Sequence, residues 1–97
     1  MTGESARQTV VITNPQGFHM RPMAAFVEAA NRFPCAVAVT RAGGASAANG
    51  KSILSLMGLV AVPGTELVIE ATGPRAAEAL QALLAVFQRN YEEDESP

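Results

Sequence analysis

The sequence predicts a single α+β domain in which helices cover one face of an antiparallel sheet. Strand-like runs and helix-spaced apolar stripes follow one another in the order βαββαβα, instead of alternating strictly as in a parallel α/β protein. The chain has 97 residues, of which 48% are hydrophobic and 16% charged, and this composition supports one folded core. Several folds share this element order, so it leaves the order of the strands in the sheet open.

The first strand is predicted at residues 8–13, which hold an unbroken run of β-branched residues. The sequence NPQG at 14–17 is a cluster of turn formers, so a loop follows and leads to His19. Apolar residues then recur at helical spacing between Met23 and Phe33, before a proline. This pattern predicts an amphipathic helix of about three turns.

The middle of the chain is predicted to hold a hairpin and a short helix. Residues 36–41 alternate as a strand does, the glycines within 42–45 suit a two-residue turn, and 45–48 form a second, weaker strand. Residues 53–58 then form a short helix, for which Ser52 stands at the N-cap position.

The last strand and helix are the most regular parts of the pattern. Residues 65–71 alternate between apolar and polar, which predicts a half-buried strand. Residues 72–74, with the sequence TGP, open the final helix and place Pro74 in its first turn. The buried stripe of this helix is predicted to consist of Leu80, Leu83, Leu84, Phe87 and Tyr91.

The domain is expected to span residues 8–91, between a flexible N-terminus at 1–7 and a frayed acidic tail at 92–97. The net charge of −2 is divided unevenly, because residues 1–91 hold 7 basic against 5 acidic groups and the tail adds 4 acidic groups. Neither part has the basic stripe with interleaved aromatic residues that nucleic-acid binding needs. No nucleic-acid partner is therefore expected.

The remaining composition indicates a soluble protein in a reducing compartment. Cys35 is the one cysteine, the N-terminus lacks the apolar run of a signal peptide, and no apolar run approaches the roughly 20 residues that span a bilayer. A cytoplasmic location without membrane insertion is expected. With one histidine and one cysteine, no metal or other cofactor is expected, and Cys35 is interpreted as a small hydrophobic residue at a strand start.

The chemistry is predicted at His19, the one histidine of the chain, which stands at a helix start after a proline and glycine turn. The first N–H groups of a helix lack internal partners, and an anion there is stabilised by roughly 0.3–1 kcal/mol. Arg21 adds a guanidinium whose geometry matches phosphate oxygens. An imidazole in this place can bind or carry phosphate. A lone histidine is more often a surface or capping residue, so these residues alone leave both interpretations open.

A nucleotide-binding loop is excluded at Gly50-Lys51-Ser52, although these residues resemble the end of such a loop. The motif requires a glycine at position 45, and that position holds alanine. Ser52 is therefore interpreted from its position as a helix cap.

Two longer segments resemble a known family. Residues 14–22, NPQGFHMRP, and 49–59, NGKSILSLMGL, are similar to the active-site and regulatory-serine motifs of the histidine-containing phosphocarrier protein (HPr) family of the bacterial phosphoenolpyruvate-dependent sugar phosphotransferase system. The similarity extends over about residues 8–91, and the two motifs together are more specific than either alone. The resemblance implies an open-faced β-sandwich, with a four-stranded antiparallel sheet of order 1-4-2-3 and three helices on one face.

The same resemblance implies a phosphoryl carrier and not an enzyme with turnover of its own. His19 would accept a phosphoryl group on Nδ1 from phosphoenolpyruvate-charged enzyme I and pass it to a sugar permease component of the enzyme IIA type. Arg21 matches the phosphate-contacting arginine of the family, and Ser52 matches the serine that a kinase/phosphatase modifies in some bacteria. The sugar served, and the choice between sugar uptake and nitrogen-linked regulation, stay open.

An exposed apolar interface for partners is expected beside the histidine, formed by Met20, Met23, Leu54 and Met57. Met20 and Met23 are bulkier than the residues usual in the family at these positions. The first helix also carries Glu28 and Asn31 where many members have basic residues, so the preference for partners is left open.

Two functions of other classes are the alternatives. The first is a regulatory HPr-like binding module that is controlled by phosphorylation of His19 or Ser52. The second is a small anion-binding enzyme of acylphosphatase-like architecture, which is disfavoured because no second catalytic group accompanies His19 in its segment.

Overall fold

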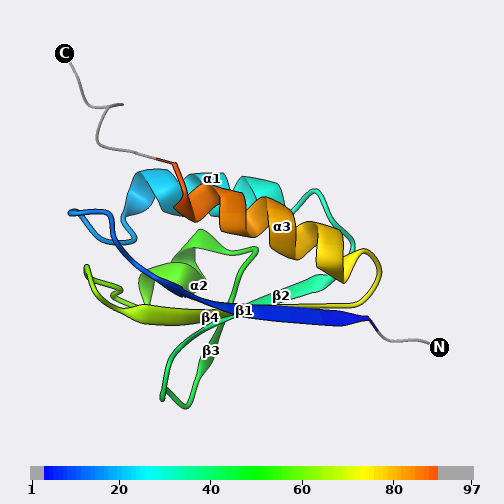
Figure 1. The fold of residues 1–97 in the computed structure, drawn as a ribbon, viewed down its shortest axis with the longest axis horizontal. Helices are drawn as coiled ribbons and strands as arrows, with labels where there is room; N and C mark the ends of the chain where they lie inside the picture. Colours follow the sequence, from blue (N-terminus) through cyan, green and yellow to red (C-terminus); the bar gives the residue numbers. More distant parts are fainter. Residues whose placement is uncertain (1–3, 90–97) are drawn as a thin grey trace.

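The computed structural model describes residues 4–89, and its elements follow the predicted order βαββαβα. Helices α1 and α3 lie side by side over one face of the sheet, and α2 packs against α1 and β3 on the same side (Figure 1). The predicted α+β class is confirmed. The strands are β1 (Ser5–Val11), β2 (Ala36–Arg41), β3 (Ala47–Asn49) and β4 (Glu66–Thr72), and the helices are α1 (Met20–Ala30), α2 (Ile53–Met57) and α3 (Ala76–Phe87).

The sheet has four antiparallel strands in the order β1-β4-β2-β3, which is the order that the resemblance implied. The central strand β4 pairs with β1 from Ser5↔Thr72 to Val11↔Glu66. Alternate residues of β4 are buried beneath the helices, namely Leu67, Ile69 and Ala71. The predicted alternation of the last strand is thus confirmed.

An aromatic cluster connects the helical layer with the loop that carries the histidine. Phe18, Phe26 and Phe87 form it, with ring centroids 5.3, 5.7 and 5.9 Å apart. Phe18 is only 4% exposed and directly precedes His19. The core therefore holds the neighbour of the histidine in place. Cys35, at 1% exposure, belongs to the same core, which confirms its interpretation as a small hydrophobic residue.

Strand β1 lies earlier in the chain than predicted, at residues 5–11 instead of 8–13. The reason is that β4 offers a partner to each of the seven residues of β1, so residues 5–7 extend the sheet and do not form part of a flexible N-terminus. After Val11 the chain turns, and the Ile12 N–H donates to the carbonyl of Thr65 at 2.9 Å. The boundaries of β3 and β4 differ from the predicted ones by one or two residues.

Helix α3 begins at Ala76, so Pro74 precedes the helix and does not stand in its first turn as predicted. Arg75, at the N-cap, has a left-handed φ of 64°, and the Ala76 N–H donates to Oε1 of Glu4 at 3.1 Å. A side chain next to β1 therefore sets this helix start. Arg75 Nε also donates to Glu78 at 2.8 Å, and this hydrogen bond lowers the pKa of Glu78 and raises the pKa of Arg75.

The stripe predicted for α3 is confirmed where the structure describes it. Leu80 and Leu83 are buried, while Leu84 and Phe87 are half-buried against the core. Tyr91 and the predicted tail at 92–97 lie outside the described residues.

Candidate functional site

The loop between β1 and α1 is held by backbone hydrogen bonds. The Gly17 N–H donates to the carbonyl of Asn14 at 2.8 Å, and the Phe18 N–H donates to the carbonyl of Ala61 at 2.9 Å. Gly17 has φ +75°, and a Cβ there would lie 2.7 Å from the Ala61 oxygen, so only glycine fits without displacement. This loop delivers His19 to the N-cap of α1, as predicted from the sequence.

The start of α1 suits an anion. Met20 and Arg21 lie in the first turn, where the backbone N–H groups have no acceptor within the helix. Pro22, the next residue, has no N–H. The Met23 N–H donates to the carbonyl of His19 at 3.0 Å. The His19 side chain makes no capping hydrogen bond to this end, and the first turn holds no acidic residue. The positive end of the helix dipole thus lies next to the imidazole.

The His19 ring is half-buried, and its two nitrogens have different surroundings. Nδ1 lies 3.1 Å from the carbonyl oxygen of Gly17. A carbonyl oxygen only accepts, so this contact is a hydrogen bond when Nδ1 carries the proton. Nε2 is buried and has no hydrogen-bond partner among residues 4–89. In this tautomer the lone pair is on the buried nitrogen, which costs about 1–3 kcal/mol, so this ring orientation is only weakly stabilised.

Arg21 lies two residues after His19, and its side chain is exposed. The loop and helix therefore place both residues at the same helix end. The contact of Arg21 with a phosphate on His19 stays a prediction.

Ser52 is the N-cap of α2, which confirms the predicted cap. Its Oγ accepts from the Ser55 N–H at 3.2 Å, and the Oγ of Ser55 in turn accepts from the Asn49 N–H at 2.8 Å. Lys51 Nζ donates to the carbonyl of Phe33 at 2.7 Å, which connects this turn to the segment after α1. Ser55 was missed by sequence reasoning, because nothing in its spacing distinguishes it from an ordinary polar helix residue.

The expected apolar interface is partly wrong. Met20, Leu54 and Met57 are 54%, 82% and 46% exposed, but Met23 is only 7% exposed and belongs to the core. Met23 stands three residues before the fully buried Phe26, so both lie on the face of α1 that packs against the core. The role of the three exposed residues in binding a partner stays a prediction.

Two further exposed apolar residues lie beside the histidine loop. Val60 and Val62 are 66% and 56% exposed and flank Ala61, whose carbonyl accepts from Phe18. The Cα of Val62 also lies against Gly17. Sequence analysis did not single out either residue as part of an interface. The alternation itself is visible in the sequence, since the small residue Ala61 is buried and the valine on each side of it is exposed.

Val60 has φ 49°, a left-handed conformation that is rare for a β-branched residue. Arg41 Nη1 donates to the carbonyl of Leu59 at 3.0 Å and stabilises the turn from outside. The strain is local, because two-thirds of the Val60 surface is exposed and little packing depends on its side chain.

Val60→Gly is therefore expected to raise the free energy of unfolding by about 0.5–1 kcal/mol, since glycine adopts this φ without strain and its extra chain entropy offsets only part of the gain. Urea denaturation measures the change. Val62→Gly is the matched control, because Val62 is similarly exposed without a positive φ and its replacement should destabilise. Equal losses in both variants would contradict the assignment of strain to Val60.

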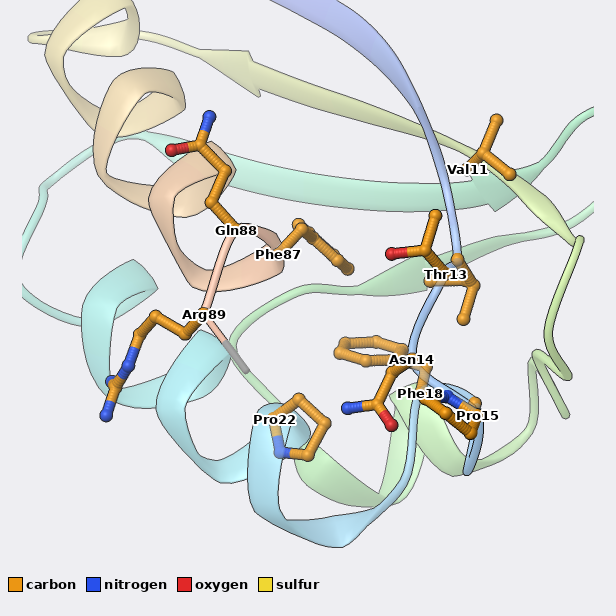
Figure 2. Close-up of a pocket in the computed structure, with 11 residues that line it drawn as sticks. Val11, Thr13, Asn14, Pro15, Phe18, Pro22, Phe87, Gln88 and Arg89 are labelled. Atoms are coloured by element: carbon orange, nitrogen blue, oxygen red, sulfur yellow. The ribbon is translucent and has the colours of Figure 1, made fainter. Parts of the chain in front are cut away.

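A pocket of about 310 Å³ lies beside the same loop, between the end of β1, the first turn of α1 and the end of α3 (Figure 2). It is lined by Phe18 and Pro22, on either side of His19 in the chain, but not by His19 itself. The pocket is therefore a neighbour of the candidate site and not its phosphate cradle. Among residues 4–89, no three His, Cys, Asp or Glu side chains gather where they could hold a metal ion.

The family profile described as "PTS HPr component phosphorylation site" matches residues 6–89. The chain belongs to the PTS HPr family. Its fold is similar to the phosphocarrier protein HPr from Bacillus anthracis str. Ames, with a TM-score of 0.75 and 34% sequence identity over 84% of this chain and 95% of that chain. HPr-C-His from Thermoanaerobacter tengcongensis gives a TM-score of 0.80 at 29% identity, over 95% of this chain and 99% of that chain.

Relatives of this HPr-family chain are named as phosphocarriers. It is 36% identical over 90 residues to phosphocarrier protein NPr of Escherichia coli (strain K12), which covers 93% of this chain and 99% of that protein. It is 40% identical over 86 residues to phosphocarrier protein HPr of Pseudomonas aeruginosa, which covers 89% of this chain and 94% of that protein. The protein is therefore a phosphocarrier of the phosphotransferase system with a phosphohistidine intermediate, and it is not an enzyme. In the described part of the chain, none of the helices has the length and apolar character to cross a bilayer.

Proposed function

We propose that His19 accepts a phosphoryl group from phosphoenolpyruvate-charged enzyme I and passes it to an enzyme IIA-type permease component. The observation that carries this proposal is the place of the one histidine of the chain at the N-cap of α1, with the positive helix end beside it and no acidic residue in the first turn. Arg21, exposed in the same turn, supplies a second positive group for the phosphoryl oxygens.

The transfer needs a change in the ring of His19. The hydrogen bond from Nδ1 to the Gly17 carbonyl requires a proton on Nδ1. Nucleophilic attack requires a lone pair on that nitrogen instead. We expect the proton to move to Nε2 and the ring to turn about the Cβ–Cγ bond, which removes Nδ1 from the carbonyl. The Nδ1 lone pair then attacks phosphorus, the N–P bond forms, and the donor group leaves with the electrons of its bond to phosphorus.

The direct test is incubation with phosphoenolpyruvate and a catalytic amount of enzyme I, followed by intact-mass measurement. One phosphoryl group should appear, and it should disappear when an enzyme IIA-type component is added. A phosphoramidate is labile in acid and stable in base, which separates it from a phosphoserine at Ser52. Incorporation that survives acid would contradict the proposal.

The N-cap geometry of Ser52 favours regulation at this residue as a second role. A phosphate on its Oγ would add about −1.5 to −2 charge at the end of α2, which is the helix that carries the exposed Leu54 and Met57. A helix N-terminus tolerates such a charge, so the fold should change little. A kinase/phosphatase acting on Ser52 would thereby change how partners dock near this helix.

Ser52→Asp is expected to lower the rate of phosphoryl acceptance from enzyme I by roughly 10-fold, because electrostatic effects on association have about that size or more. The free energy of unfolding should stay within about 0.5 kcal/mol of the wild-type value, since aspartate caps helices as well as serine does. Ser52→Asn is the matched control, because it keeps the cap without the charge and should transfer at the wild-type rate. If the two variants transfer equally, Ser52 is a simple cap and the regulatory role is lost.

A further inference from the structure

The segment between α2 and β4 supports the loop that carries the histidine. The Ala61 carbonyl accepts from the Phe18 N–H at 2.9 Å, and Phe18 directly precedes His19. The same oxygen lies where a Cβ on Gly17 would meet it at 2.7 Å. Whatever fixes the position of Ala61 therefore also fixes the backbone from which the His19 side chain extends.

Arg41 reaches this segment from the sheet. It ends β2, and its place two residues after the fully buried Val39 puts it on the face of the sheet that the helices cover. Arg41 Nη1 donates to the carbonyl of Leu59 at 3.0 Å, and the same nitrogen lies 3.5 Å from the carbonyl oxygen of Val60. Among residues 4–89, no backbone N–H donates to either carbonyl. The guanidinium thus holds two consecutive carbonyls directly before Ala61.

The segment needs such a donor, because its backbone is strained at Val60. A left-handed φ of 49° is unfavourable for a β-branched residue, and it persists only where the surrounding structure determines it. The buried side chains of Leu59 and Ala61 supply part of that constraint. The Val60 side chain is exposed and contributes little packing. The hydrogen bonds from Arg41 therefore supply the constraint that packing at Val60 does not.

The backbone of Arg41 is itself fixed on both sides. Arg41 pairs with Leu67 of the central strand β4, and the next N–H, that of Ala42, donates to the carbonyl of Glu66 at 2.9 Å. The Gly44 N–H donates to the carbonyl of Arg41 at 2.8 Å. The guanidinium therefore extends from a strand end that the sheet and the following turn hold in place.

We propose that Arg41 is a positioning residue for phosphoryl transfer at His19. It acts through the turn at 59–62, whose Ala61 carbonyl holds the Phe18 amide and with it the start of α1. Its hydrogen bonds go to backbone carbonyls, so it places the nucleophile and does not react with the phosphoryl group. A displacement of about 1 Å can lower a rate by roughly 10²-fold, so a small shift of this turn is enough. The inference rests on the proposed role of His19 as the acceptor.

The first measurement is hydrogen exchange in the protein alone. Arg41→Met keeps the aliphatic stem and removes every donor. Exchange of the Phe18 amide should accelerate roughly 10-fold relative to the amides of β4, on the order expected for loss of a hydrogen bond from a charged donor. The β4 amides report global unfolding, so this ratio separates a looser loop from a less stable protein. The imidazole nitrogen shifts of His19 should also change, because the carbonyl of Gly17 contacts Nδ1.

The second measurement is the single-turnover rate of phosphoryl transfer from phosphorylated enzyme I. In Arg41→Met, the rate constant at saturating concentration should fall roughly 10-fold, because the nucleophile is misplaced within the complex. The half-saturating concentration should change by less than about 3-fold, since binding does not depend on this placement. Arg41→Lys keeps a charged donor without the fork that spans two carbonyls, and it should recover part of the loss in both measurements.

Arg7→Met is the matched control, because it removes an arginine from another part of the same sheet. Arg7 is exposed on β1, and its neighbour Ala6 packs against the core, so the Arg7 side chain lies on the open face. This variant loses the same charge and should change neither the Phe18 exchange nor the transfer rate. Equal effects in the two methionine variants would mean that charge alone acts, and that result would overturn the inference.

The two measurements also separate the other outcomes. Slower transfer with unchanged Phe18 exchange would mean that Arg41 meets enzyme I directly, and faster exchange with wild-type transfer would mean that the turn does not position His19. Either result overturns the inference and leaves the proposed function intact. A wild-type chain that takes up no phosphoryl group at His19 would overturn the proposed function and this inference together.

Discussion

His19→Ala is expected to abolish phosphoryl incorporation from phosphoenolpyruvate and enzyme I. The chain has no other histidine, so no other imidazole can form the phosphoramidate. The fold should survive, because the His19 side chain makes no capping hydrogen bond to α1, and within residues 4–89 its one hydrogen-bond contact is with the carbonyl of Gly17. Loss of that contact costs about 0.5–1.5 kcal/mol, and it is offset by removal of the buried Nε2 without a partner.

The measurement is intact-mass spectrometry after incubation, with circular dichroism to check the fold. Arg21→Ala is the comparison, because it keeps the nucleophile and removes the guanidinium. It should give the same acid-labile product at a rate roughly 10²-fold lower, the effect typical of removing one stabilising donor from a developing charge. Incorporation that persists in His19→Ala would rule out the carrier mechanism at this residue and favour the regulatory binding module.

Gly17→Ala should both destabilise the protein and slow transfer. Gly17 has φ +75°, which costs an alanine about 1–2 kcal/mol, and its new Cβ would lie 2.7 Å from the backbone oxygen of Ala61. Displacing backbone to relieve that contact adds about 1–3 kcal/mol, so the expected loss is about 2–5 kcal/mol. The shift falls on the loop that holds His19, because the Phe18 N–H donates to the same oxygen.

Urea denaturation and the initial rate of incorporation measure the two effects. Gly43→Ala is the matched control, since Gly43 has φ +79° but no atom within 4 Å of a Cβ placed there. It should lose about 1–2 kcal/mol from conformational strain alone and transfer at the wild-type rate. If Gly17→Ala transfers as fast as Gly43→Ala at equal fractions folded, the close approach of Gly17 to Ala61 does not position the histidine.

The element order and the place of the histidine followed from local patterns. Strand β4 was evident because its alternate residues face a core on one side and solvent on the other. Ser52 was evident as a cap because N-caps satisfy backbone N–H groups only a few residues away. The order of the strands came from the resemblance of two motifs, because pairing between distant strands leaves no mark on local spacing.

Boundaries and exposure depended on partners that lie far away in the sequence. β1 begins at Ser5 because β4 pairs with it there, although the local propensity for strand is strongest later. Met23 is buried because α1 turns it toward Phe26 and the core, whereas a methionine near a histidine motif had suggested a surface role. The left-handed φ of Val60 is equally unpredictable, since valine by itself avoids it.

The sequence by itself therefore determined the α+β class, the helix start at His19 and the cap at Ser52, since each depends on residues within one turn or one strand. The tertiary structure alone decided three other features: the contact of Gly17 with Ala61, the exposure of Val60 and Val62, and the pocket that Phe18 and Phe87 help to line. The physical reason is that each of these forms between segments separated by many residues. Their distances are set by packing of the whole core and not by the preference of any one segment.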